Sequence, residues 1–104
     1  TRVNEPSAQV TLAQEVETLK LYLEIEKMRF EDRLRPHFRI EPATIGARLP
    51  SLLLQPLIEN AIKYAVTPSE SGADIWISAA RTGEFVRIEV ADNGTGAHEA
   101  LVAT

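Results

Sequence analysis

The chain has no cysteine among its 104 residues. Disulfide bonds, thiolate metal ligands and thiol nucleophiles are therefore excluded from its chemistry. Long apolar stretches are missing as well, since a run such as Leu52–Leu54 is far shorter than the roughly 20 residues of a membrane-spanning helix. There is no low-complexity tract and no internal repeat. The composition is that of an ordinary globular protein.

Charge of one sign is not concentrated anywhere in the sequence. Eleven Lys and Arg residues are scattered among fifteen Asp and Glu residues, and the formal net charge is −4. The basic stripe that binds a nucleic-acid backbone is lacking, so we expect neither nucleic acid nor a membrane surface as a partner. With 44% hydrophobic residues, the chain suffices for one core. We predict a linker over residues 1–10 and one domain over residues 11–104.

The first predicted helix spans residues 11–32. Thr11 and Gln14 fit a capping box, in which each side chain bonds a free backbone N–H group at the start of a helix. Apolar residues then recur at near-helical spacing and predict one buried face. These residues are Leu12, Val16, Leu19, Leu23 and Phe30.

The second predicted helix is announced by Pro50 and ends before Pro68. Pro56 lies inside its pattern, so the regular helix either starts just before this proline or bends there. The residues of its apolar stripe are Leu57, Ile58, Ala61, Ile62 and Ala65.

Three segments alternate in polarity as strands do, namely residues 35–41, 75–80 and 86–90. Thr82 and Gly83 separate the last two and suit a tight hairpin turn. The order helix, strand, helix, strand, strand predicts an α+β fold. We expect a two-layer sandwich with the helices on one face of a mixed or antiparallel sheet.

Three polar residues of the second helix fall on the face opposite its apolar stripe. Asn60, Lys63 and Tyr64 have the spacing i, i+3, i+4. An amide oxygen is a suitable ligand for Mg²⁺, and a nearby ammonium group can neutralise phosphate. A solvated helix face gives the same pattern and is the more common explanation of spacing alone.

The second candidate segment is Asp92–Gly96, which follows the last predicted strand. A carboxylate at a strand end can accept a hydrogen bond from an exocyclic amine, and the glycines let backbone approach a ligand closely. Asp-Asn-Gly is also a common turn sequence, so a simple turn is the alternative.

Taken together, these segments resemble motifs of a known family. Residues 54–64 (LQPLIENAIKY) look like the N box of sensor histidine kinases, and residues 92–96 (DNGTG) look like their G1 box. Residues 22–30 (YLEIEKMRF) resemble the segment that precedes the ATPase domain in the LytS-like branch. The resemblance covers residues 11–96 and implies the GHKL (Bergerat) ATP-binding fold shared with gyrase, Hsp90 and MutL.

The resemblance also implies a role for each residue of the N box. Asn60 would coordinate Mg²⁺ and Lys63 would contact phosphate, so both would serve catalysis. Tyr64 would lie close to the nucleotide. Catalysis in such a site consists mainly of positioning and charge neutralisation.

In the G1 box, the resemblance implies that Asp92 binds the adenine amine, directly and through water. Gly94 and Gly96 would line the base and open the ATP lid. Such kinases pass the γ-phosphoryl group of ATP to a histidine and then to an aspartate of a response regulator. The expected context is a homodimer with its own dimerisation and phosphoacceptor domain. This ATP-binding domain would be cytoplasmic, in a parent that is often anchored in the cell membrane.

The sequence departs from the family pattern after the G1 box. A glycine-rich G2 box should follow, but residues 97–104 contain no glycine. We therefore interpret the chain as truncated, with an incomplete sheet, weak or no ATP affinity and no activity alone. The phosphoacceptor histidine is missing too. His37 lies in a strand pattern and is expected to face solvent, whereas His98 is expected in a tail.

Two further readings stay open. Hydrolysing relatives of the Hsp90 and MutL type carry a glutamate four residues before the Asn, but Pro56 stands there, which favours a kinase. Glu59 is either a general base or the surface partner of Lys63 at i+4. The other alternative is a degenerate module that binds nucleotide or protein without phosphotransfer.

Overall fold

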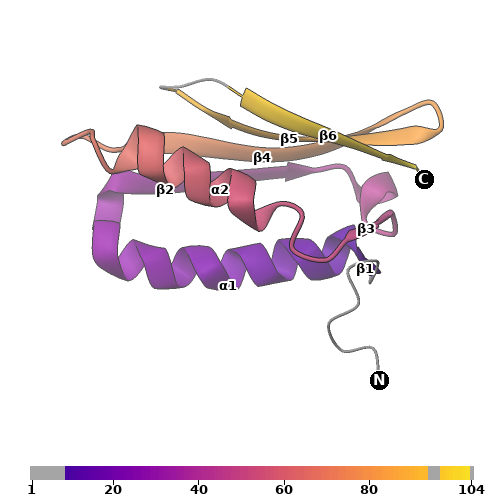
Figure 1. Cartoon of the computed structure of the whole chain (residues 1–104), viewed down its shortest axis with the longest axis horizontal. Helices are drawn as coiled ribbons and strands as arrows, with labels where there is room; N and C mark the ends of the chain where they lie inside the picture. Colours follow the sequence, from indigo (N-terminus) through magenta and orange to yellow (C-terminus); the bar gives the residue numbers. More distant parts are fainter. Residues whose placement is uncertain (1–8, 94–96, 104) are drawn as a thin grey trace.

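The main sheet of the protein is covered by two helices on one face (Figure 1). The structure, a computed structural model, describes residues 9–93 and 97–103. The strand order is β2-β4-β5-β6. β2 (Leu34–Ile40) is parallel to β4 (Ala73–Thr82), whereas β5 (Phe85–Asp92) and β6 (Ala97–Ala103) continue the sheet in antiparallel pairing. The predicted two-layer α+β arrangement with a mixed sheet is confirmed.

The helix α1 (Leu12–Phe30) begins where the capping box predicts. The Gln14 N–H donates to Thr11 Oγ1 (3.2 Å), and the Thr11 N–H donates to Gln14 Oε1 (2.9 Å). All five residues of the predicted apolar face are buried. The amphipathic pattern therefore identified the helix and the face that packs toward the sheet.

The helix α2 (Gln55–Ala61) starts just before Pro56, which was one of the two possibilities for this proline. A proline in the first turn removes no helical hydrogen bond, because the N–H groups there have no partner within the helix. The chain continues as a π-helical turn over Ile62–Val66 and ends before Pro68, as predicted. The segment around Pro50 is not helical. It forms the short strand β3 (Arg48–Pro50), which pairs with β1 (Gln9–Thr11).

The strands β4 and β5 supply the sheet's part of the core. Their inward side chains alternate with outward ones, and Ile77 lies opposite Val90 in the antiparallel register. The turn between them consists of Gly83 and Glu84, one residue later than predicted, with Gly83 at φ 64°. The buried inward residues of these two strands are Ala73, Ile75, Ile77, Ala79, Val86, Ile88 and Val90.

Two predictions about the chain ends need correction. The linker was expected over residues 1–10, but Gln9 and Val10 already belong to β1, while residues 1–8 lie outside the described residues. The tail expected after the G1 box is instead the strand β6. Its backbone satisfies the free edge of β5, which a tail would leave unpaired. None of the helices in the described ranges combines the length and apolar content needed to cross a bilayer.

A buried carboxylate joins α1 to the start of α2. The side chain of Glu15 accepts hydrogen bonds from the N–H groups of Leu52 (3.3 Å) and Leu54 (3.1 Å), and Glu15 itself is only 3% exposed. These two amides lie in the loop that leads into α2. Their hydrogen bonds to Glu15 hold this loop against α1. A single acidic side chain thus fixes the point at which the second helix begins.

We expect Glu15→Ala to lower the free energy of unfolding by about 2–3 kcal/mol, because two backbone amides lose a charged acceptor and the Leu54 amide is buried. Urea denaturation followed by circular dichroism measures the change. Glu17→Ala is the matched control. Glu17 is exposed on the same helix and only pairs loosely with Lys20 (3.9 Å), so its loss should stay below about 0.5 kcal/mol. Equal losses in both variants would contradict the structural role of Glu15.

Candidate functional site

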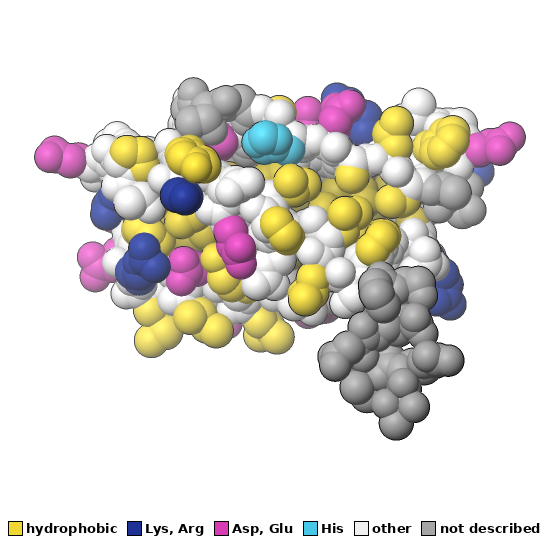
Figure 2. Space-filling model, viewed as in Figure 1, with side chains coloured by type: hydrophobic (Ala, Val, Ile, Leu, Met, Phe, Trp, Pro, Cys, Tyr) yellow, Lys and Arg dark blue, Asp and Glu magenta, His cyan; other side chains and the backbone are white. Residues whose placement is uncertain are grey.

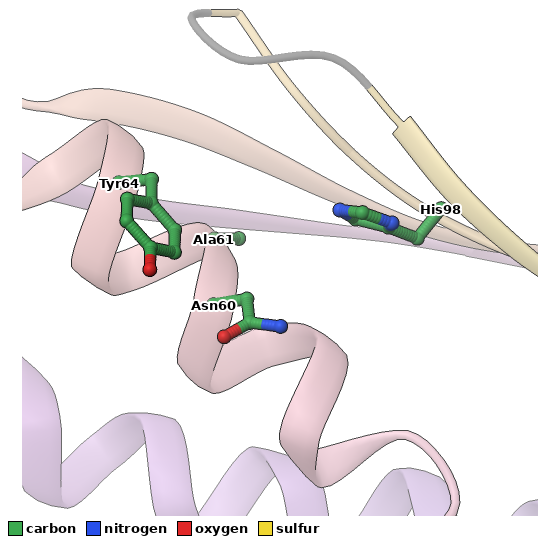
Figure 3. Close-up of a pocket in the computed structure, with 4 residues that line it drawn as sticks. All are labelled: Asn60, Ala61, Tyr64 and His98. Atoms are coloured by element: carbon green, nitrogen blue, oxygen red, sulfur yellow. The ribbon is translucent and has the colours of Figure 1, made fainter.

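A pocket of about 350 Å³ lies between α2 and β6. Asn60 and Ala61 of α2, Tyr64 of the π-helical turn and His98 of β6 line it. Asn60 and Tyr64 project from one side of the helix, and His98 points back toward them from the strand (Figure 3). Hydrophobic side chains gather around the hollow between α2 and β6 in the surface view (Figure 2). This combination of apolar wall and few polar groups is typical of small-molecule sites.

The helix presents these side chains because its other face is buried. Ile58 and Ile62 are almost fully buried, while Asn60 and Tyr64 are exposed, Tyr64 by 55%. The π-helical turn starts at Ile62, whose carbonyl accepts the N–H of Thr67 (2.9 Å). A π-turn inserts an extra residue per turn, and such turns are frequent at functional sites. The predicted polar face is therefore real, and the pocket uses two of its three residues.

Lys63 and Glu59 do not form the ion pair that their spacing predicts in the described part of the structure. The Lys63 Nζ lies over the ring of Tyr64, 5.2 Å from its centre. The Glu59 carboxylate accepts a hydrogen bond from Gln55 Nε2 (3.2 Å). Burial raises the pKa of Tyr22 on α1, and the charges of Glu26 and Glu59 raise it further. The Glu59 carboxylate is thus engaged by Gln55 rather than by Lys63.

Asp92 is the last residue of β5 and lies half-buried on the helix-facing side of the sheet. In the strand register, His98 of β6 lies opposite Val90 of β5. Asp92 is two residues beyond Val90 and shares its face, so it is a diagonal neighbour of His98, at about 7–8 Å. Asp92 therefore lies on the same sheet face as His98, but it does not itself line the pocket. Gly94 and Gly96 lie outside the described residues.

His98 is the pocket residue that sequence reasoning missed. The prediction that it belongs to a tail is wrong, because residues 97–103 pair with residues 85–91 of β5. The sequence gives little signal here, because apolar residues such as Ala100 and Leu101 occupy both sets of alternate positions. Without a partner strand in view, that pattern does not distinguish a strand from a tail.

On the opposite face of the sheet, His37 is 46% exposed, as predicted. Its ring stacks on Trp76 (centroids 5.6 Å apart), and its Nε2 lies 2.9 Å from Asp74 Oδ1. Hydrogen bonds from His37 and then Arg35 hold the pKa of Asp74 below its usual value. Asp74 is therefore an acceptor-only carboxylate at neutral pH, which assigns the proton of this contact to His37 Nε2.

The described residues contain no group of three or more His, Asp or Glu side chains that could hold a metal by themselves. This fits Mg²⁺, which keeps most of its waters and is bound through one or two protein ligands plus phosphate oxygens. Asn60, which lines the pocket, carries such an amide oxygen.

Comparisons with known protein families match both parts of the chain. A family model for the histidine kinase-, DNA gyrase B-, and HSP90-like ATPases matches residues 46–103, and a histidine kinase model matches residues 2–34. The first match contains α2, β4, β5 and β6, and therefore the whole pocket. The second contains α1.

Curated relatives are similar over most of the chain. The sensor histidine kinase BtsS of Escherichia coli K12 is 40% identical over 91 residues, which are 88% of this chain and 16% of that protein. The sensor histidine kinase YesM of Bacillus subtilis is 39% identical, over 84% of this chain and 15% of that protein. The sensor histidine kinase/phosphatase LytS of Staphylococcus aureus is 38% identical over similar shares, 84% and 15%. The chain spans about one sixth of the length of these relatives.

Solved structures share the fold at lower identity. The histidine kinase AdeS of Acinetobacter baumannii superimposes with a TM-score of 0.64 and 18% identity, over 86% of this chain and 43% of that chain. The catalytic domain of the histidine kinase ThkA also gives a TM-score of 0.64, with 16% identity over 85% of this chain and 59% of that chain. At this identity, the likeness concerns the arrangement of the helices and strands.

Proposed function

Because the chain belongs to the family of histidine kinase-, DNA gyrase B-, and HSP90-like ATPases, we propose that its pocket binds Mg²⁺–ATP for a sensor histidine kinase. One observation carries the proposal. Asn60 and Tyr64 of the N box share a pocket with His98, and the register of β5 and β6 brings Asp92 to the same face of the sheet. The pocket residues of the N box and Asp92 thus lie on the helix-covered side of the sheet, which supports a shared site.

The residues present fit the proposed ligand. The pocket volume, about 350 Å³, lies at the small end of the range of about 300–1,000 Å³ for ligand sites. Asp92 would accept a hydrogen bond from the adenine amine, and Tyr64 would pack beside the nucleotide. Lys63, exposed one turn after Asn60, would neutralise phosphate. His98 adds a ring nitrogen to the wall formed by β6.

The chain's own contribution to phosphoryl transfer is positioning. Mg²⁺, when bound, neutralises charge on the phosphates, and Asn60 would hold it from the helix side. Asp92 would anchor the base at the sheet, and Lys63 would contact the phosphates from the helix side. The acceptor histidine, the dimerisation domain and the response regulator belong, in this proposal, to the full-length protein outside residues 1–104. In this proposal, the glycine-rich G2 box of the full-length protein completes the ATP lid that Gly94 and Gly96 open.

The proposal favours a kinase over a hydrolase because, among the described residues, no glutamate lines the pocket. Pro56 occupies the position four residues before Asn60 and has no group that activates water. Glu59 accepts a hydrogen bond from Gln55 and does not line the pocket. We therefore propose transfer of the γ-phosphoryl group to a histidine rather than to water.

Asn60→Ala in the full-length protein is expected to reduce autophosphorylation at least about tenfold, because the Mg²⁺–phosphate unit loses its protein ligand. Transfer of ³²P from ATP to the protein measures this effect. Gln55→Ala removes an amide from the same helix outside the pocket and should keep full activity. Unchanged autophosphorylation in the Asn60 variant would refute the Mg²⁺ assignment. ATP hydrolysis that depends on Glu59 would instead support the hydrolase.

A further inference from the structure

A hydrogen-bonded network on the outer face of the sheet ends at the residue after Asp92. Its centre is Asp74 of β4. The Oδ1 atom of Asp74 accepts from Arg35 Nε (3.1 Å) and His37 Nε2 (2.9 Å), both from β2. The Oδ2 atom accepts from Asn93 Nδ2 (3.3 Å), just past the end of β5. The network therefore links the edge strand β2, across β4, to the segment that resembles the G1 box.

Asp74 and Asn93 hold each other by two reciprocal hydrogen bonds. Besides the contact between their side chains, the backbone N–H of Asp74 donates to Asn93 Oδ1 (3.2 Å). Both groups of the Asn93 amide are thus used, and the amide cannot rotate without breaking one of them. We call these two bonds the Asp74–Asn93 clamp.

The clamp lies where the regular pairing of β5 with β4 ends. The last register pair of these two strands joins Ile75 to Asp92. Beyond that pair, the backbone hydrogen bonds between β4 and β5 no longer fix the direction of the chain. The clamp fixes it one residue later, at Asn93. The backbone at Asp92 is thus fixed by the strand pairing up to this residue and by the clamp at the next residue.

We infer that Asp74 is a positioning residue for nucleotide recognition, which through Asn93 holds the Asp92 carboxylate in the direction that selects adenine. This inference rests on the proposed function. A carboxylate discriminates between bases only if its lone pairs are fixed, because a free rotation would let it meet other donor patterns. Asp74 lies on the outer face of the sheet, so it acts on the nucleotide only through Asn93.

The chemistry of the clamp gives a test by exchange of the two residues. In Asp74→Asn, the side chain keeps one acceptor oxygen, and an NH2 group, which can only donate, replaces the other. The oxygen can still accept from Arg35 and His37, but the NH2 group then faces the NH2 group of Asn93. In Asn93→Asp, two carboxylates face each other. In the double variant, the amide at position 74 donates to the carboxylate at position 93, its oxygen accepts from β2, and the backbone bond at 74 is kept. The geometry of the clamp is then restored with its polarity reversed.

The experiment compares the dissociation constants of Mg²⁺–ADP and Mg²⁺–GDP, by calorimetry, in the full-length protein and its variants. Each single exchange should weaken ADP binding about tenfold, which is the effect of one hydrogen bond to a charged group. It should also bring the ratio of the GDP and ADP dissociation constants closer to one. The double variant should recover ADP affinity to within about threefold, together with the preference. Arg87→Gln breaks an ion pair with Glu99 on the same face of the sheet and should change neither constant.

Four outcomes would overturn the inference. If the single exchanges leave the ADP/GDP preference unchanged, Asp74 has only a structural role. Losses that simply add in the double variant would show that the two residues are not coupled. If Asp92→Asn loses ADP binding while Asp74→Asn does not, the inference fails and the proposed function stands. If the unsubstituted protein binds no ADP, both fail.

Discussion

Gly72→Ala is expected to destabilise the protein more than any other variant considered, by about 4 kcal/mol or more. Gly72 has φ 81°, a conformation that costs a residue with a side chain about 1–2 kcal/mol. A Cβ atom there would also overlap the carbonyl oxygen and the α-carbon of Arg33. Both obstacles are backbone, which cannot move aside as a flexible side chain can. Because domains of this size are stable by only about 5–15 kcal/mol, a large part of the stability is lost.

Thermal unfolding followed by circular dichroism tests this expectation. The melting temperature of Gly72→Ala should fall by about 15 °C or more, at roughly 4–8 °C for each kcal/mol. Gly83→Ala is the matched control. Gly83 also has a positive φ, 64°, but open space surrounds the position of its missing Cβ, so it should lose only about 1–2 kcal/mol. Equal losses would show that the close approach to Arg33 is not rigid.

The close approach at Gly72 also matters for the pocket. The guanidinium group of Arg33 donates to the carbonyl oxygens of Val66 (2.9 Å), Thr67 (3.1 Å) and Ser69 (2.9 Å). These carbonyls lie at and after the end of the π-helical turn that carries Tyr64. Gly72 lets the chain pass directly over the Arg33 backbone on its way into β4. The segment around Arg33 therefore ties the start of the sheet to the end of the helix that lines the pocket.

The elements that could be predicted from the sequence are those with a local signal. The capping box located the start of α1 at Thr11 because both of its hydrogen bonds join residues three apart. Pro56 allowed the regular helix either to start just before it or to bend at it, and the observed helix starts just before it. The polar face of Asn60 and Tyr64 followed from helical spacing, and the family resemblance then named the chemistry that the face could perform.

The features that could not be predicted depend on residues far apart in the sequence. β1 and β3 are three residues each, and only their mutual pairing makes them strands. His98 enters the pocket because β6 pairs with β5. The Asp74–Asn93 clamp joins residues 19 positions apart across a hairpin. Periodicity within a short window carries no information on which strand lies beside which.

Asp92→Asn is expected to weaken the binding of Mg²⁺–ADP about 100-fold. The substitution keeps the size of the side chain, but it removes the negative charge and replaces one acceptor oxygen by a donor. The adenine amine then loses a charge-assisted hydrogen bond, and a donor faces a donor if the amide does not rotate. Together these effects amount to about 3 kcal/mol, which is roughly 100-fold in affinity. Asp32→Asn, which changes an exposed aspartate after α1, should have no effect on binding.

The most direct test of the proposed site is calorimetric titration of Mg²⁺–ADP into the full-length protein, its Asp92→Asn variant and its Asp32→Asn variant. The nucleotide site between α2 and the sheet predicts saturable binding to the unsubstituted protein and to Asp32→Asn, and a loss of about 100-fold in Asp92→Asn. Equal ADP affinity in all three proteins would contradict it, because adenine would then be recognised somewhere other than the end of β5.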